Sequence, residues 1–182
     1  MSKALVIVDM CRGFVEEEVN GNACAFYMES AGELIPEINK YIKKHLNAET
    51  DYVVHVNDSH HDNDIEIAKT GMDKHCMWDT EETETAPGFE YGDVRVTEMF
   101  KNTFSGFHNT PLNTFLRKRG VTDIVVVGVA TEICVFYTAI DGVRLGYNVV
   151  VERGLTRGTD EFGDVTEACM GLLEHHWGIE VR

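Results

Sequence analysis

The sequence predicts an α/β fold with helices on both faces of a parallel sheet, because short apolar runs alternate along it with amphipathic helical stretches. The runs are Leu5 to Val8, Tyr52 to Val56, Val94 to Val96, Ile124 to Val127, Val149 to Val151 and a last short one near Ile179. Residues 124–127 are apolar on both faces, as in the strands of a covered parallel sheet. Strands that alternate with helices imply right-handed crossovers. We therefore predict a three-layer α/β/α fold with a doubly wound, six-stranded parallel sheet of Rossmann-like type.

The intervals between these runs carry the pattern of helices that bury one face. Between the first two runs, apolar side chains recur at helical spacing at Leu34, Ile35, Ile38, Tyr41, Ile42 and Leu46. After the fourth run, the same spacing is seen at Val135, Phe136, Ala139, Ile140 and Val143. Two further helical stretches lie near residues 111–119 and 163–176.

The composition suits one globular domain over residues 1–182, with 43% hydrophobic and 26% charged residues. The chain has 16 Lys and Arg against 31 Asp and Glu, a formal net charge of −15. Because this charge repels polyphosphates and anionic lipids, we expect neither nucleic acid nor a membrane among its partners. The five cysteines are odd in number and widely scattered, which indicates reduced thiols in a cytoplasmic protein. The expected assembly is a homo-oligomer.

Two segments interrupt the alternation of strands and helices. Residues 57–92 form a long, polar excursion that is rich in acidic and histidine side chains. Residues 99–110 form a shorter loop rich in Gly, Asn and Thr. Loops longer than about 15 residues are uncommon in compact domains and are usually functional or disordered, so the first segment is a candidate for binding.

Four reactive side chains follow four separate strands of the predicted sheet. Asp9 ends the first strand, Asp58 ends the second, the third leads to Lys101 and the fourth leads through a glycine to Cys134. In open α/β sheets, ligands bind beyond the carboxyl ends of the strands. The sequence therefore predicts that these four side chains converge at one edge of the sheet.

Cys134 lies in a strand-to-helix turn, Gly-Val-Ala-Thr-Glu-Ile-Cys over residues 128–134. At the start of a helix, unpaired amides and the helix dipole stabilise a thiolate and lower the pKa of the thiol. The same amides can hold an oxyanion. The alternative is an inert cysteine buried under the helix, since free cysteines are often fully buried.

Asp9 and Lys101 can supply the acid–base chemistry that a cysteine nucleophile needs. Asp9 can act as general base toward the thiol, while Lys101 lowers the pKa of the thiol and orients the carboxylate. A Cys–His pair has little support, because His108 is the one histidine near the third and fourth strand ends. The alternatives are a turn-capping role for Asp9 and a solvated loop charge for Lys101.

These residues together resemble a known family, the isochorismatase-like cysteine hydrolases, and within it the nicotinamidase branch. The resemblance rests on the order Asp9, Lys101, Cys134 and on the cysteine turn followed by Thr-Ala-Ile-Asp at 138–141. It implies a six-stranded parallel sheet flanked by helices. It also implies that Asp9 is the general base, Lys101 the stabiliser of the thiolate and the transition state, and Cys134 the nucleophile that forms a thioester.

The resemblance further implies the oxyanion hole. The family has a cis peptide bond before the residue that matches Ala130. The backbone amides of Ala130 and Cys134 would then hold the oxyanion. A cis bond that does not involve proline costs roughly 3–4 kcal/mol, so it persists only where the surrounding structure holds it.

A divalent metal site is implied by Asp58, His60 and His75, which match the Asp-x-His…His pattern of nicotinamidases. Two imidazoles and one carboxylate suit Zn²⁺, and Mn²⁺ or Fe²⁺ are alternatives. In the family, the metal binds the pyridine nitrogen of the substrate. Asp64 or Glu66 could be a further or water-mediated ligand, and a solvated histidine loop is the alternative to a metal site.

Three side chains are expected to line the substrate pocket. By the resemblance, Phe14 matches an aromatic that stacks on the substrate ring and Phe104 stands where a second pocket aromatic would lie. Met72 stands where nicotinamidases usually carry Trp or Phe, and Cys11 stands where the family usually has Gln. The expected activity is hydrolysis of nicotinamide to nicotinate and ammonia, in NAD salvage. The alternatives are another small amide or N-carbamoyl substrate, or a non-catalytic metal-binding or interaction protein.

Overall fold

A six-stranded parallel sheet organises the protein, whose computed structural model describes residues 2–159 and 163–182. The strand order is β5-β4-β1-β6-β7-β8, and every neighbouring pair is parallel. The strands are β1 (Lys3–Val8), β4 (Tyr52–Asp58), β5 (Arg95–Lys101), β6 (Asp123–Val129), β7 (Asn148–Arg157) and β8 (Glu180–Val181). The chain winds outward from β1 in one direction and from β6 in the other. This arrangement confirms the predicted three-layer, doubly wound fold.

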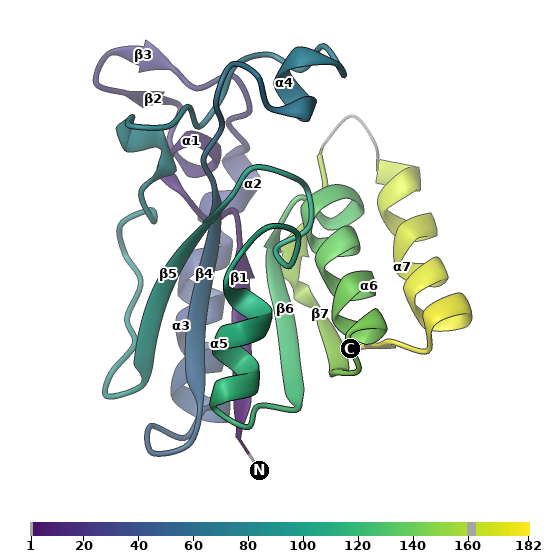
Figure 1. Ribbon diagram of the computed structural model, residues 1–182. Helices are drawn as coiled ribbons and strands as arrows, with labels where there is room; N and C mark the ends of the chain where they lie inside the picture. The colour runs from purple at the N-terminus through teal and green to yellow at the C-terminus, as the bar shows by residue number, and fades with distance from the viewer. Residues whose placement is uncertain (1, 160–162) are drawn as a thin grey trace.

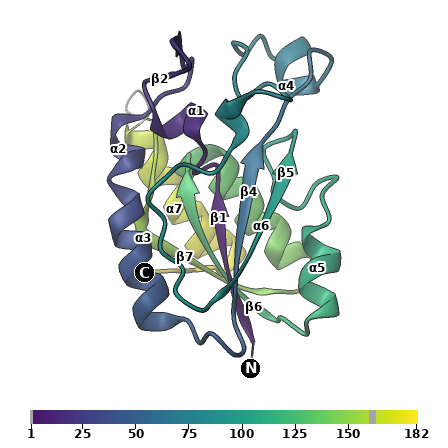
Figure 2. The same ribbon diagram turned by 90° about the vertical axis from the view of Figure 1, so that its left-hand side faces the viewer.

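Helices cover both faces of the sheet (Figures 1 and 2). The larger ones are α3 (Leu34–His45), α5 (Leu112–Lys118), α6 (Phe136–Arg144) and α7 (Gly163–Trp177). Side chains of β1 alternate between the two cores: Val6 and Val8 pack with residues of α5, α6 and α7, whereas Leu5 and Ile7 pack with α3. Because successive side chains of a strand point to opposite faces, an apolar run buried on both sides is what this position requires.

The apolar face of α3 explains its place against the sheet. Its buried side chains, Leu34, Ile35, Ile38 and Ile42, repeat at three- and four-residue spacing and lie in one core cluster. Pro36 falls in the first turn, where a missing amide hydrogen costs little. The helix ends after His45, at an extended Leu46.

Small elements gather beyond the carboxyl ends of the strands, at the top of Figures 1 and 2. They are α1 (Arg12–Val15), the hairpin of β2 (Glu18–Val19) and β3 (Asn22–Ala23), α2 (Glu29–Gly32), α4 (Ile65–Ala68), the 3₁₀ turn η1 (Glu81–Thr83) and the π turn η2 (Thr131–Val135). The sequence did not predict α1, the β2–β3 hairpin, α2 or α4. They are too short to show a period of their own, so contacts with distant segments decide them.

Two strands extend at least five residues beyond the predicted runs. The third expected strand covered 94–96, but β5 extends to Lys101, so residues 99–101 belong to the sheet and not to a loop. β5 lies at the edge of the sheet and mixes polar with apolar side chains, so it shows no continuous apolar run. β7 extends to Arg157 past a register shift opposite β6, where the predicted strand ended at Val151.

The polar excursion is partly ordered as short structure. Its first two residues, Asn57 and Asp58, are the end of β4, and the rest contains α4 and η1. A single parallel bridge joins His60 to Met77. Over residues 2–159 and 163–182, no helix has the length and apolar character needed to cross a bilayer.

Candidate active site

A cavity of about 520 Å³ lies at the carboxyl ends of the strands. It is lined by Phe14, Ala25, Phe26, Tyr27, Met28, Asp58, His60, Glu66, Met72, His75, Phe104, Ala130, Ile133, Cys134 and Thr159. The strands β1 and β6, whose ends meet here, are the pair at which the winding of the sheet reverses. Ligands of doubly wound sheets bind at this switch point. The cavity is therefore in the expected place for a substrate.

Asp9 directly follows β1, and its backbone has φ 52°, in the left-handed region that non-glycine residues seldom adopt. Its amide donates to the carbonyl of Val56, 3.1 Å away, and its Oδ1 accepts a hydrogen bond of 2.8 Å from the amide of Asp58. The side chain is fully buried. The strained backbone thus turns the carboxylate away from the strand direction and across toward β4 and β5.

Lys101, the last residue of β5, joins the other three strand-end groups. Its Nζ lies 2.8 Å from Asp9 Oδ2, 2.5 Å from Asp58 Oδ1 and 3.4 Å from Cys134 Sγ. The Lys101 side chain has no exposed surface. All four side chains that the sequence places at strand ends therefore come together, and the alternative of a solvated loop charge for Lys101 is wrong.

Cys134 lies in the π turn η2 and not at the start of the helix, since α6 begins two residues later at Phe136. The peptide bond between Val129 and Ala130 is cis, as the resemblance implies. Just before it, Gly128 has φ +109°, and a Cβ there would lie 2.1 Å from the carbonyl oxygen of Val8. Glycine is needed at this point because β1 and β6 approach each other so closely.

Burial raises the pKa of Asp9 to about 6, and the negative charge of Asp58 adds to this effect, while Lys101 opposes it. For Asp58, burial on its own would raise the pKa, but the charge of Lys101 and hydrogen bonds from His60 and His75 outweigh burial and lower it. The two carboxylates therefore differ: Asp58 stays ionised, whereas Asp9 can exchange a proton near neutral pH, as a general base must.

The pKa of the Cys134 thiol is raised, where the sequence reading expected it to be lowered. Burial is the largest cause, and although the charge of Lys101 lowers the pKa, the charges of Asp9 and Asp58 raise it again. The resting thiol is therefore protonated. A thiolate would have to form by transfer of the proton to a neighbouring base such as Asp9.

Asp58, His60 and His75 form a cluster that suits a divalent cation. One ligand atom from each lies within 4.8 Å of the others, and all three side chains are buried. Both imidazole Nε2 atoms face Asp58, at 3.4 Å from Oδ1 for His60 and 3.7 Å from Oδ2 for His75. The Nδ1 of His75 lies 2.8 Å from the carbonyl oxygen of Asp73. If Nδ1 donates its hydrogen to this oxygen, the lone pair of Nε2 is available to bind a metal. Two imidazoles and a carboxylate are a zinc-type donor set.

Neither Asp64 nor Glu66 belongs to this cluster. Asp64 Oδ2 lies 3.8 Å from His60 Nδ1, and its two oxygens accept hydrogen bonds from the amide of His61 and the side chain of Asn102. Glu66 lines the cavity, and its buried Oε2 finds no hydrogen-bond partner among the described residues.

Aromatic side chains form the wall beside the two histidines. Phe14, Met72 and Phe104 all line the cavity, as the sequence reading expects of pocket residues. Phe26 was missed: its ring centroid lies 4.5 Å from that of His75, and Phe14 lies 5.8 Å from the same ring. Segment 25–28 follows the β2–β3 hairpin, which has no strand-end signal that could have drawn attention to it. Ile133, which lies inside the cysteine turn, and Thr159, which follows the end of β7, also line the cavity and were not predicted.

Cys11 and Cys76 contact each other beside the site. Their sulfur atoms lie 3.6 Å apart and both side chains are fully buried. Cys11 follows Asp9 by two residues and Cys76 directly follows His75. The departure from the usual glutamine at position 11 is thus matched by a second small thiol facing it.

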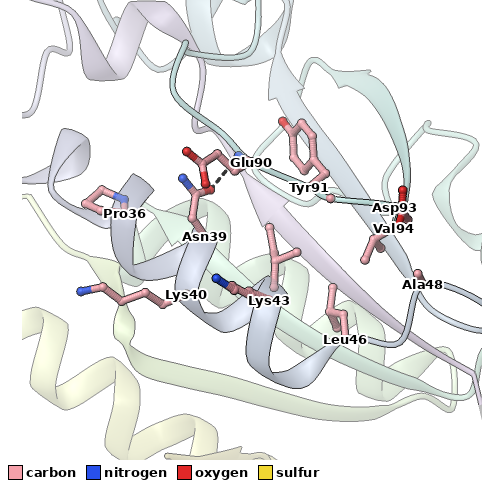
Figure 3. Close-up of a pocket in the computed structure, with 12 residues that line it drawn as sticks. Pro36, Asn39, Lys40, Lys43, Leu46, Ala48, Glu90, Tyr91, Asp93 and Val94 are labelled. Carbon is pink, nitrogen blue, oxygen red and sulfur yellow. Dashed lines mark hydrogen bonds between the residues drawn. The ribbon is translucent and has the colours of Figure 1, made fainter.

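A second cavity of about 650 Å³ lies between α3 and residues 90–94, near the ends at which β4 and β5 begin (Figure 3). Its lining includes Lys40, Lys43 and Tyr91, and one hydrogen bond joins the amide of Glu90 to Asn39 across it. It contains none of the strand-end groups and has no part in the chemistry discussed below.

Known proteins resemble this chain over nearly its whole length. The nicotinamidase/pyrazinamidase of Mycobacterium tuberculosis is 29% identical over 181 residues, covering 92% of each chain. The crystal structure of a pyrazinamidase of Pyrococcus horikoshii in complex with zinc has a TM-score of 0.79 at 28% identity, covering 99% of this chain and 98% of that one. An N-carbamoylsarcosine amidase of Thermoplasma acidophilum has a TM-score of 0.82 at 25% identity, covering 100% and 96%.

The chain also matches a protein family as a whole. The isochorismatase domain matches residues 3–165, a range that contains β1, β4, β5 and β6 together with every strand-end group of the cavity. The chain therefore belongs to the isochorismatase family.

Proposed function

We propose that this protein is a nicotinamidase, which hydrolyses nicotinamide to nicotinate and ammonia through a thioester on Cys134. The observation that carries the proposal is the position of Lys101, whose Nζ contacts Asp9, Asp58 and Cys134 at once. This contact supports the proposal because it brings a carboxylate, a thiol and a candidate metal ligand together beside the cavity. Such an enzyme would return the pyridine ring to NAD synthesis.

The first half of the reaction makes the thioester. Asp9 takes the proton of the Cys134 thiol, and the thiolate attacks the amide carbon. The backbone amides of Ala130 and Cys134 hold the oxyanion that forms, and the positive charge of Lys101 stabilises it. The C–N bond then breaks, and the proton on Asp9 goes to the leaving ammonia.

The second half consumes one water. Asp9 takes a proton from the water as it attacks the thioester carbon, and the same oxyanion site is used again. The C–S bond breaks and the thiolate regains a proton from Asp9. The sum is one amide and one water giving one carboxylic acid and one ammonia, with Asp9 and Cys134 returned to their starting states.

The donor set of Asp58, His60 and His75 fits a divalent cation, and we propose zinc, which the Pyrococcus horikoshii structure contains. When bound, the cation supplies a Lewis acid that can accept the ring nitrogen of a pyridine amide. Phe14 and Phe26 lie beside His75, where they can pack against such a ring.

The direct test is release of ammonia from nicotinamide by purified, zinc-loaded protein. We expect release by the wild type and none above background from the Cys134→Ala variant. Cys169→Ala is the matched control, since this cysteine lies on α7 and outside the cavity lining, and it should keep full activity. Failure of the zinc-loaded wild type to release ammonia would exclude nicotinamide as the substrate.

A second candidate is hydrolysis of an N-carbamoyl compound, and the unpartnered Oε2 of Glu66 favours it. A ureido group carries more N–H donors than a pyridine amide, and a buried carboxylate oxygen in the cavity wall can accept from one of them. Met72 also offers a weaker ring clamp than an aromatic side chain. A panel of pyridine amides and N-carbamoyl amino acids distinguishes the two: a higher kcat/KM on the ureido compounds, lost in Glu66→Gln, would favour this candidate.

A further inference from the structure

Glu132 lies within the π turn η2, between the proposed oxyanion residue Ala130 and the nucleophile Cys134. Its side chain is 8% exposed. A carboxylate this deeply buried needs partners for both oxygens. Its partners are Thr159, just after β7, and Thr166, in the first turns of α7.

The hydrogen bonds of Glu132 are short and use both oxygens. Oε1 accepts from the backbone amide and from the hydroxyl of Thr159, each at 2.8 Å. Oε2 accepts from the hydroxyl of Thr166, at 3.0 Å. Because one oxygen bonds to Thr159 and the other to Thr166, this one side chain ties the end of β7 and the start of α7 to the turn.

Gly158 shows how closely the two segments approach. A Cβ at this position would lie 2.6 Å from Glu132 Oε2 and 2.0 Å from the hydroxyl oxygen of Thr166. No side chain can be accommodated there without moving the carboxylate or its partner. The packing therefore leaves the Glu132 side chain little freedom to move.

Thr159 gives this contact a link to the substrate. It lines the same cavity as Ala130, Ile133 and Cys134. Its hydroxyl is held by Glu132, which fixes the side-chain rotamer and thus the shape of the wall at this point. One carboxylate therefore connects the turn that carries the nucleophile to a residue in the wall of the substrate cavity.

We propose that Glu132 is a positioning residue for the cysteine turn and that Thr159, held by it, limits the size of the substrate. The proposal rests on the amide hydrolysis proposed above for Cys134. Loss of the Glu132–Thr159 bonds should loosen the turn and lower kcat. Loss of the Thr159 methyl group, with the hydrogen bonds to Glu132 kept, should instead change the relative kcat/KM of larger and smaller substrates.

Two substitutions at position 159 separate these roles. Thr159→Val keeps the size and removes the hydroxyl bond, so we expect kcat on nicotinamide to fall about tenfold, as in Glu132→Ala. Thr159→Ser keeps the hydroxyl and removes a methyl group. It should improve kcat/KM for a ring-methylated nicotinamide relative to nicotinamide by at least fivefold. Glu132→Gln keeps an acceptor for Thr159 and should recover part of the loss.

Glu98 offers a matched control outside the cavity. Its Oε1 also accepts hydrogen bonds from the amide and the hydroxyl of a threonine, Thr85, as well as from the side chain of Asn57, and none of these residues lines the cavity. Glu98→Ala should therefore lower the thermal midpoint without changing kcat or the substrate ratio. If Glu132→Ala behaves in the same way, with only its stability lowered, Glu132 has a structural role and the proposal is wrong.

A measurement without substrate separates this proposal from the proposed function. The rates at which iodoacetamide and the bulkier N-phenylmaleimide alkylate Cys134 can be compared by mass spectrometry. The ratio of the bulky to the small rate should rise at least threefold in Thr159→Ser and in Glu132→Ala, and not in Glu98→Ala. This result would support the proposal even if nicotinamide were not hydrolysed. An unchanged ratio in both variants would overturn it.

Discussion

Lys101 is a buried positive charge between two buried carboxylates and a thiol. Its contacts with Asp9 and Asp58 replace the water that all three groups lose on folding, and they hold the pKa of Lys101 well above its usual value although burial opposes this. Removal of one member of such a group leaves uncompensated charge in the interior. The convergence of Lys101 with the other reactive groups could be predicted from the sequence, whereas its place within β5 and its complete burial could not.

Lys101→Met should destabilise the fold by about 3–5 kcal/mol at neutral pH, because Asp9 and Asp58 lose their partner. Burial and the charge of Asp58 already raise the pKa of Asp9, and without Lys101 to oppose them it rises further above its value in the unfolded chain, so the folded state binds a proton more tightly. The loss should therefore be smaller at pH 5 than at pH 7.5. Urea denaturation at the two pH values measures the difference, and Asp58→Asn added to Lys101→Met should recover part of the stability. An equal loss at both pH values would contradict the charge explanation.

Asp9 has a pKa of about 6, and this value gives a pH dependence to the reactivity of the thiol. Only ionised Asp9 can take the proton of Cys134, so alkylation of Cys134 should slow as the pH falls through about 6 and level off above it. Iodoacetamide labelling of metal-free protein, quantified at Cys134 between pH 4.5 and 8, provides the profile. In Asp9→Asn this step should disappear, and a wild-type profile without a step near pH 6 would remove Asp9 from the role of base.

At the scale of elements, the end of β6 determines the geometry of the nucleophile. Gly128 pairs with Val8 on β1 and leads through the cis bond at Ala130 into the π turn that carries Cys134. The residue pattern of this turn is local, so the sequence was enough to identify it. The length of β5 was not predictable in the same way, because a mostly exposed edge strand with mixed polar and apolar side chains resembles a loop until its partner strand is known.

Gly128→Ala should lower the free energy of unfolding by about 4 kcal/mol or more, or prevent folding, since its Cβ would clash with the backbone of Val8. Gly171→Ala in α7 is the matched control, as no atom within 4 Å would meet the added methyl group. It should raise the stability by about 0.5–1 kcal/mol through helix propensity. The urea midpoint of each variant measures its stability, and the yield of folded protein replaces it for a variant too unstable to purify. Similar midpoints for the two variants would contradict the close approach of β1 and β6.

At the scale of the whole molecule, the strand order assembles the site. Because β5, β4, β1 and β6 are neighbours and parallel, four residues from positions 9 to 134 reach one edge. His60 and His75, in the segment between β4 and β5, lie at the same edge, next to Asp58. This part of the prediction depended on a general rule for parallel sheets, and the structure confirms the convergence.

Zinc should stabilise the whole fold if the cluster binds it, because a ligand that binds only the folded state shifts the unfolding equilibrium. At a free concentration 100 times the Kd, the gain is about 2.7 kcal/mol. The thermal midpoint of metal-free protein should therefore rise on addition of Zn²⁺, and it should not rise in His60→Ala or His75→Ala. His61→Ala is the matched control, since His61 is exposed and lies outside the cluster. An equal rise in His60→Ala would place the bound zinc elsewhere.

The sequence by itself determined the α/β class, the two apolar faces of the central strands, and the positions of Asp9, Asp58, Lys101 and Cys134 at strand ends. These features are local: each depends on a run of a few residues and on the regular geometry of strands and helices. The tertiary structure alone decided that burial raises the pKa of the thiol, that Phe26 and Thr159 enter the cavity wall, and that Glu132 connects two segments. Burial and contacts between distant segments depend on the packed molecule, so no local pattern in the chain reports them.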